Sequence, residues 1–204
     1  GESTVYEFFL AADNDLDNLS LAWDTCGEDQ GGGAIPIVLG DDDFEEIPLP
    51  FTFSYCETPY NSVFVGSNGF LTFGSGDTDF SQSVGELLAN EPRIAGLWTD
   101  LSPNQAGSVT WEDIGGAVEI TFTGVTQFLA GNSNNFKYTL RDDNTYSIEY
   151  GQEDATSALC GRSEGGGATD PGPTDLSAAA QPIGAGLSTV YENFLGNQDV
   201  ANPA

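Results

Sequence analysis

Histidine and methionine are both absent from this 204-residue chain, and only Arg93, Lys137, Arg141 and Arg162 are basic. Without histidine, the chain has no Ser-His or Cys-His dyad and no imidazole ligand for zinc. Four basic side chains cannot neutralise a phosphate backbone, which excludes nucleic acid as a partner. No run approaches the roughly 20 apolar residues of a membrane span, and no signal peptide is found. A start at Gly1 without methionine indicates a processed or excised chain.

Acidic residues dominate the charge, with 32 Asp and Glu and a formal net charge of -28. Such a surface repels itself and requires screening by salt or by bound divalent cations. The charge therefore indicates a secreted protein from a saline setting, a calcium-binding protein, or simply a soluble acidic surface. Hydrophobic residues make up 39% of the chain, enough to argue for a folded core rather than disorder.

Cysteine is also scarce: Cys26, Cys56 and Cys160 allow one disulfide and one free thiol. In an extracellular setting we expect one bridge. The pairing stays open, and the glycine beside both Cys26 and Cys160, at the borders of the central region, favours that pair.

Residues 47–73 contain the clearest structural pattern. Apolar side chains alternate with polar ones or proline from Ile47 to Ser54, which is the period of a half-buried strand. Two further β-rich runs, at 62–65 and 70–73, flank Asn68-Gly69. Asn-Gly between such runs predicts a hairpin, because both residues tolerate positive φ.

Similar runs continue through the chain, and they predict an all-β fold. Short strands are expected at the ranges 3–10, 19–23, 35–39, 94–98, 107–112, 117–123, 135–141 and 145–150, with helical turns only at 84–89. Strands at intervals of about ten residues are typical of a sandwich or barrel. We predict an antiparallel β-sandwich with long acidic loops and terminal strand segments that pair with neighbouring subunits.

The predicted organisation has four parts. They are an N-terminal strand segment with an acidic loop (1–34), a β-sandwich core (35–160), a linker rich in Gly, Ala and Pro (161–187), and a C-terminal strand segment (188–204).

The C-terminal segment repeats the N-terminal one. STVYENFL at 188–195 matches STVYEFFL at 3–10 in seven of eight positions, and the similarity continues more weakly to residues 18 and 202. The chain is therefore one unit of a tandem array, or it carries two equivalent terminal strands, unless one favoured strand sequence is simply used twice.

Residues 47–150 resemble the nidogen-like extracellular β domain found in large secreted bacterial surface proteins. The resemblance is carried by IPLPFTFSYCETPYNSVFVGSNGFLTF, RIAGLWTDLSP and FKYTLRDDNTYSIEYG. Gly96 and Thr99 depart from the family pattern Ile-Ala-Pro-Phe-Trp-Asp-Asp-Leu. The resemblance implies an extracellular adhesion or matrix module, with no enzyme activity and no defined binding residues.

Two acidic segments are candidate calcium sites. Asp13, Asp15, Asp17 and Asp24 have the spacing of an oxygen-ligand loop, although Asn18 stands where the sharp turn prefers glycine. The run at 41–46 could hold a cation, or it could be an acidic edge that discourages strand pairing. A solvated polar turn is the alternative for the first segment.

The sequence favours an extracellular structural subunit that assembles head-to-tail by strand addition, with calcium bridging acidic surfaces. The residues expected to form the polymerisation strands are Val5, Tyr6, Phe9, Leu10, Val190, Tyr191, Phe194 and Leu195. The alternative is a monomeric adhesion module that binds carbohydrate or matrix protein through exposed aromatics such as Trp98 and Trp111. Catalysis is not expected, and Asp100 is the best catalytic candidate.

Overall fold

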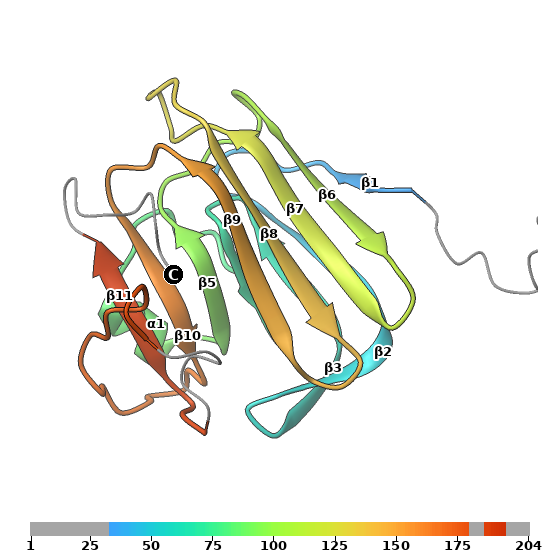
Figure 1. Ribbon diagram of the computed structural model, residues 1–204, viewed down its shortest axis with the longest axis vertical. Coiled ribbons are helices and arrows are strands. Elements are labelled where there is room, and N and C mark those ends of the chain that lie inside the picture. Colours follow the sequence, from blue (N-terminus) through green and yellow to red (C-terminus); the bar gives the residue numbers. More distant parts are fainter. Residues whose placement is uncertain (1–32, 180–185, 195–204) are drawn as a thin grey trace, which may run out of the picture. The chain divides into compact units, whose positions relative to one another are not determined.

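The computed structural model describes residues 33–179 and 186–194. This part of the chain forms eleven strands and one short helix, whose arrangement is drawn in Figure 1. In order they are β1 (Ile35–Ile37), β2 (Phe44–Tyr55), β3 (Thr58–Gly66), β4 (Phe70–Thr72), α1 (Val84–Ala89), β5 (Arg93–Trp98), β6 (Ser108–Asp113), β7 (Ala117–Val125), β8 (Asn134–Arg141), β9 (Tyr146–Glu153), β10 (Ala158–Ser163) and β11 (Val190–Phe194).

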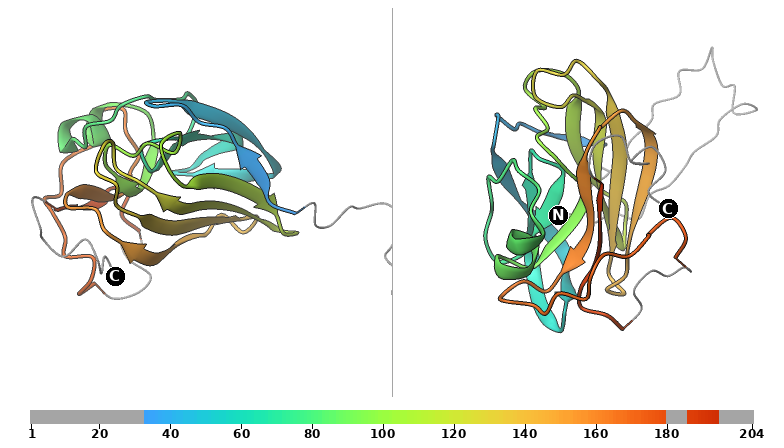
Figure 2. Two further views of the ribbon diagram at one scale, coloured as in Figure 1. Left: turned by 90° about the horizontal axis from the view of Figure 1, so that it is seen from above. Right: turned by 90° about the vertical axis from the view of Figure 1, so that its left-hand side faces the viewer.

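The strands form two antiparallel sheets that face each other (Figure 2). One has the order β1-β6-β7-β8-β9, and the other has the order β11-β10-β5-β4-β3-β2. Every pairing among the described strands is antiparallel. The predicted antiparallel β-sandwich is therefore confirmed.

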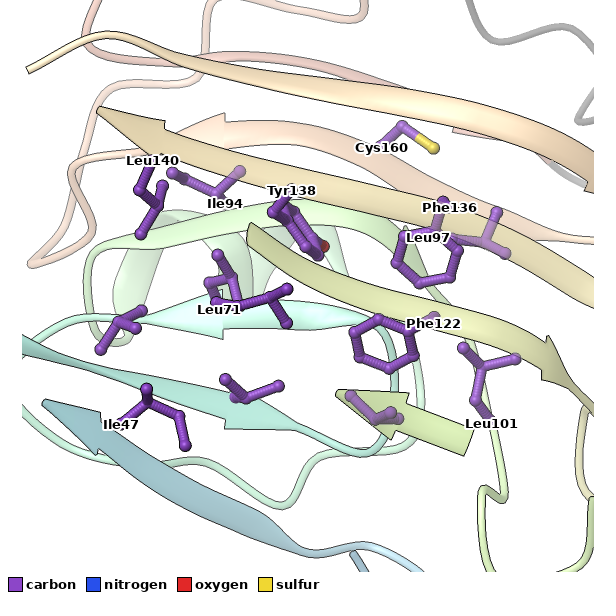
Figure 3. Close-up of a cluster of buried hydrophobic side chains, with 14 of the residues drawn as sticks. Ile47, Leu71, Ile94, Leu97, Leu101, Phe122, Phe136, Tyr138, Leu140 and Cys160 are labelled. Atoms are coloured by element: carbon purple, nitrogen blue, oxygen red, sulfur yellow. The ribbon is translucent and has the colours of Figure 1, made fainter. Parts of the chain in front are cut away.

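The core fills the space between the sheets with side chains from alternate strand positions. Figure 3 shows Leu71, Ile94 and Leu97 of one sheet packed against Phe122 and Phe136 of the other. The rings of the two phenylalanines stack with centroids 4.5 Å apart. This burial is the main source of stability, because apolar area removed from water contributes about 25 cal/mol per Å².

The turn at Asn68-Gly69 joins β3 to β4, as the sequence predicts, but its geometry differs from the expected one. Gly66 pairs with Phe70, so the loop has three residues, and only Gly69 has positive φ (78°). A Cβ on Gly69 would lie 2.2 Å from the carbonyl oxygen of Leu97. Gly69 is thus required both by its backbone conformation and by the close approach of β5.

Asn68 is buried and joins the hairpin to the segment after β5. Its Oδ1 accepts a hydrogen bond from the Leu101 N–H (2.9 Å), and its carbonyl accepts one from the Thr99 N–H (3.2 Å). Its Nδ2 donates to Asp42 Oδ1 (3.0 Å). Two of the segments that carry the nidogen-like resemblance are therefore bonded to each other in the fold.

Gly96, a departure from the family pattern, faces a buried tyrosine of the opposite sheet. Its N–H donates to Tyr138 Oη (2.6 Å), and that hydroxyl donates to the Gly69 carbonyl (2.9 Å). A Cβ at position 96 would lie 2.4 Å from Tyr138 Oη. The space that a larger residue would need at position 96 is taken by the Tyr138 side chain.

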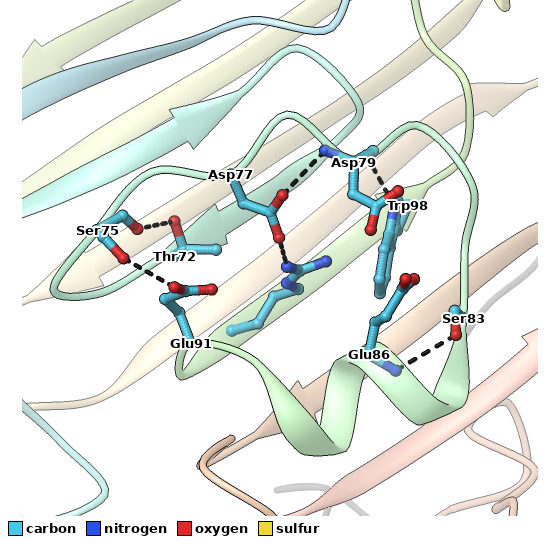
Figure 4. Close-up of polar contacts among 9 residues, drawn as sticks. Thr72, Ser75, Asp77, Asp79, Ser83, Glu86, Glu91 and Trp98 are labelled. Atoms are coloured by element: carbon cyan, nitrogen blue, oxygen red, sulfur yellow. Dashed lines mark hydrogen bonds and ion pairs between the residues drawn. The ribbon is translucent and has the colours of Figure 1, made fainter.

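Helix α1 covers the outer face of the six-stranded sheet. Ser83 caps it, since its Oγ accepts from the Glu86 N–H (3.3 Å). Leu87 of the helix packs with Trp98 and other buried residues on that face. The loop before the helix carries Asp77 and Asp79, which lie over the sheet in Figure 4.

The C-terminal half of the fold extends past the predicted core boundary at residue 160. The alternation analysis does not predict β10, whose last three residues fall in the range expected to be linker. Leu176, also in that range, is 6% exposed and packs in the core. Residues 164–179 have no regular secondary structure.

Candidate functional site

The main candidate site is the position of β11 at the edge of the six-stranded sheet. Its register pairs Val190 with Arg162, Tyr191 with Gly161 and Phe194 with Ala158. Among the described strands, β10 is its only neighbour. The last strand of the sheet is therefore supplied by the segment that repeats residues 3–10.

Side chains of β11 are buried on both faces of the sheet, as strand alternation requires. Val190 and Phe194 join the core between the sheets and are 5% and 4% exposed. Tyr191 packs on the outer face with Trp98 and Leu159. Its hydroxyl donates to Asp170 Oδ1 (2.8 Å).

The far side of β11 is bordered by residues 170–176. The Thr174 N–H donates to the Tyr191 carbonyl (2.8 Å), and the Leu176 N–H donates to Glu192 Oε2 (2.8 Å). β11 thus lies between β10 and this segment. We call the space bounded by residues 158–163 and 170–176 the β11 slot.

Gly161 of β10 allows β11 to approach closely. Its φ is 145°, and a Cβ would lie 2.3 Å from the Val190 carbonyl oxygen and 2.6 Å from Tyr191 Cα. Real Cβ contacts are essentially never that short, so any side chain at position 161 would push the occupant of the slot away. Gly161 is the residue whose replacement closes the β11 slot most directly.

One position of β11 fits the slot poorly. Asn193 lies opposite Leu159, a fully buried residue of the apolar cluster on the outer face. Asn193 Oδ1 is buried and has no hydrogen-bond partner among the residues that the structure describes. A buried amide oxygen without a donor costs free energy, because it has lost its bonds to water.

The residues predicted to form polymerisation strands are partly brought together here. Val190, Tyr191 and Phe194 all occupy the β11 slot and pair within their own chain. Leu195 and the matching N-terminal residues Val5, Tyr6, Phe9 and Leu10 lie outside the described residues.

A second candidate site is an acidic cluster formed by Asp41, Asp42 and Asp100. One carboxylate oxygen from each lies within 4.8 Å of the others. Partial burial, together with the charges of Asp42 and Asp41, raises the pKa of Asp100 above its ordinary value. Ser102 Oγ donates to Asp41 Oδ1 (3.0 Å). Hard oxygen ligands at this spacing suit a divalent cation such as Ca²⁺.

The acidic run at 41–46 supplies only the first two members of this cluster. Phe44, Glu45 and Glu46 instead begin β2, an edge strand, where exposed charges hinder pairing with another sheet. The sequence analysis missed the third member because Asp100 follows β5, far away in the chain. The other predicted calcium ligands, Asp13, Asp15, Asp17 and Asp24, lie outside the described residues.

The predicted disulfide finds no support. Cys160 is a fully buried free thiol that donates to the Gly96 carbonyl (2.8 Å), and Cys56 is a free, half-buried thiol. Burial raises the pKa of Cys160 to about 12, which keeps it protonated and unreactive. Its predicted partner, Cys26, lies outside the described residues.

The aromatic residues predicted to bind a ligand are not both available. Trp98 is fully buried beside α1, so the expectation that it is exposed is wrong, and Trp111 is half-buried against the core. A cavity of about 410 Å³ lies elsewhere, lined by Tyr55, Cys56, Tyr60 and the 164–169 loop among others.

Fold and motifs together define a β-sandwich module of the nidogen-like class. A family model described as NIDO related matches residues 18–170, well over half of the chain, and the chain belongs to that family. No curated protein and no solved structure matches it. The bacterial setting that the resemblance implies stays a prediction.

Domains of this class are in general extracellular, which agrees with the predicted localisation. Within the described ranges 33–179 and 186–194, no helix has the length and apolar character needed to cross a membrane.

Proposed function

We propose that this chain is a structural subunit of an extracellular filament or tandem array, assembled head-to-tail by β-strand addition at the β11 slot. The observation that carries the proposal is that the slot holds residues 190–194 while a nearly identical segment stands at 3–10. A slot that accepts one of these segments has the shape and polar groups to accept the other. Repetition of such a head-to-tail contact does not close on itself and yields a linear assembly.

Two of the other three sheet edges that the structure describes, β2 and β1, are poorly suited to strand addition, while the third, β9, contains no proline. Edge strand β2 carries exposed Pro48 and Pro50, which lack a backbone donor, and β1 has only three residues, one of them Pro36. β11 contains no proline. Addition of a strand at β2 or β1 is disfavoured. The β11 slot offers backbone hydrogen-bond partners on both of its sides, from β10 and from Thr174.

Gly161→Ala tests the proposal, because its methyl group would collide with any strand in the slot. We expect the variant to lose filaments in negative-stain electron microscopy and to raise the concentration needed for assembly at least about a hundredfold, as expected for a lost strand interface. Gly166→Ala is the matched control: its φ is also positive (61°), but nothing lies within 4 Å of its Cβ. Circular dichroism checks that both variants fold.

A peptide of residues 188–195 provides a second measurement that needs no variant. Added in excess to the full chain, it should compete for the slot and shorten the filaments. Isolated particles under all conditions, or filaments that are indifferent to both the peptide and Gly161→Ala, would contradict strand addition.

Calcium is the second part of the proposal: we infer that it screens the acidic surfaces that meet between subunits. The cluster of Asp41, Asp42 and Asp100 and the net charge of -28 support this. At a free calcium concentration about ten times the dissociation constant, binding adds about 1.4 kcal/mol, or roughly 3–6 °C in melting temperature. We expect this shift in the wild-type chain and its loss in Asp100→Asn, while Glu45→Gln keeps it. Equal shifts in all three would remove the cluster from the proposal.

The alternative is a monomeric adhesion module, and the cavity beside Tyr55 and Tyr60 favours it. Tyrosine rings and the polar 164–169 loop are suited to a carbohydrate ligand. Neither proposal includes a catalytic step. A chain that remains monomeric at every concentration and binds glycans on an array would support the module.

A further inference from the structure

We propose that the strand that enters the β11 slot is residues 3–10 of a second copy, and that β11 is a weaker resident strand which this segment displaces. The inference rests on the proposed function and adds to it the identity and direction of the exchange. It is carried by the single difference between the two segments and by the place of that difference in the slot.

The slot holds its resident strand through five side chains. Val190 and Phe194 are buried in the core, Tyr191 is buried on the outer face, Glu192 accepts from the Leu176 N–H, and Thr189 Oγ1 lies 3.3 Å from Ser163 Oγ. All five have identical counterparts in the N-terminal segment, in chain order Thr4, Val5, Tyr6, Glu7 and Phe9. Residues 3–10 can therefore make every one of these contacts in the same register.

The remaining position separates the two strands. Asn193 corresponds to Phe8, and Asn193 is the residue whose Oδ1 is buried without a partner among the described residues. Opposite it stands Leu159, in a cluster with Tyr191 and Trp98. A phenyl ring there would cover apolar surface, and it would remove the unsatisfied oxygen. The N-terminal segment is thus the better occupant.

The exchange has a simple balance. Each chain carries two matching segments, and the described structure contains one slot for them, so exchange between copies leaves the number of filled slots unchanged. The difference between Phe8 and Asn193 then drives it, against the advantage that β11 has from being tethered to its own slot. The tether gives β11 an effective concentration of about 1 mM at its own slot. If the slot prefers the N-terminal segment about tenfold to hundredfold, that segment competes equally, and the chain assembles, at roughly 10–100 µM.

The inference is tested by two substitutions, each of which makes the two competing strands alike at the position where they differ. Phe8→Asn weakens the incoming strand, and Asn193→Phe strengthens the resident one. We expect each to raise the concentration at the midpoint of assembly about tenfold or more, as measured by sedimentation velocity over a range of concentrations. Phe8→Leu is the matched control and should assemble like the wild-type chain. Asn193→Phe should also raise the melting temperature.

Asn193→Phe gives the sharpest decision. If Phe8 acted only as a sticky surface residue, an added phenylalanine at position 193 would promote association, whereas displacement predicts the opposite. Stronger or unchanged assembly of Asn193→Phe overturns the inference. So does a wild-type chain in which residues 3–10 occupy the slot of their own chain, which would appear as a concentration-independent release of residues 190–194 from the slot.

Peptides separate a failure of this inference from a failure of the proposed function. A labelled peptide of residues 1–12 should bind the full chain about tenfold more tightly than the same peptide with Phe8→Asn. Equal binding of the two overturns the preference but keeps strand addition. Binding of neither peptide, together with assembly that Gly161→Ala does not affect, removes strand addition itself and this inference with it.

Discussion

Asp77→Asn should lower the free energy of unfolding by about 3–5 kcal/mol, because it leaves a buried guanidinium without its counter-ion. Arg93 is fully buried, its Nη2 forms an ion pair with Asp77, and its guanidinium carbon lies 4.3 Å from the Phe70 ring centroid and 4.1 Å from that of Trp98. Burial lowers the pKa of Arg93, and the Asp77 charge opposes that shift. The lower end of the range is expected, since Asp79 and Glu91 lie near the same charge.

The substitution is nearly isosteric, so its effect reports charge rather than shape. Asparagine can still accept the Asp79 N–H, which now donates to Asp77 Oδ1 (3.0 Å). Urea denaturation measures the loss, and the double variant Asp77→Asn with Arg93→Met is the control. Methionine fills the space beside the two rings without a charge, so the double variant should be more stable than Asp77→Asn alone. Additive losses would contradict the buried-charge explanation.

Glu153→Gln should remove a large part of the dependence of stability on pH. Glu153 ends β9 and is 5% exposed; its Oε1 accepts from the Asn135 N–H (3.1 Å), while Oε2 has no partner among the described residues. Burial, with a smaller contribution from the Asp154 charge, raises the pKa of Glu153 to about 8. The folded chain therefore holds a proton there at neutral pH.

The sign follows from proton binding in the two states. Between the ordinary carboxyl pKa, 4.5, and about 8, the folded state binds one more proton at this site than the unfolded state does. Stability from this group therefore falls as pH rises through that window, by about 1.4 kcal/mol per pH unit, and is constant above it. The full effect is about 4–5 kcal/mol.

The control must separate this effect from the repulsion among acidic groups, which also grows as pH rises. Glu149 lies on the same strand and its side chain is 64% exposed, so Glu149→Gln removes a surface carboxylate without touching the buried site. Urea unfolding at pH 5, 6, 7 and 8 should give a flatter stability curve for Glu153→Gln only. A slope that both variants share would assign the pH dependence to surface charge instead.

Local sequence patterns predicted most of the sandwich because the alternation of apolar and polar residues along a strand reflects which of its side chains are buried. Alternation placed the strand that became β2, and the helix-forming residues of 84–89 correspond to α1. Asn68-Gly69 marked the hairpin, yet the expected pair of positive φ values was reduced to one. Asn68 is held by bonds to Leu101 and Thr99, and no local pattern contains those partners.

The candidate sites were less predictable because they depend on residues that meet only after folding. Asp100 joins Asp41 and Asp42 across about sixty positions of sequence. The aromatic character of Trp98 suggested a ligand surface, but α1 covers it, and the short helix did not by itself show where it would pack. β10 was missed because Gly161 and Arg162 break the alternation, although both of its edges are paired.

The sequence by itself determined the β class, the nidogen-like motifs, the extreme acidity and the duplication of residues 3–10 at 188–195. These features depend on neighbouring residues or on simple sums over the chain, so they can be recognised from the sequence alone. Only the tertiary structure decided that the C-terminal copy completes its own sheet, that Gly161 admits it, and that Asn193 is its weak point. The physical reason is that strand pairing is non-local: the worth of a side chain in a strand depends on the neighbour that the fold places opposite it.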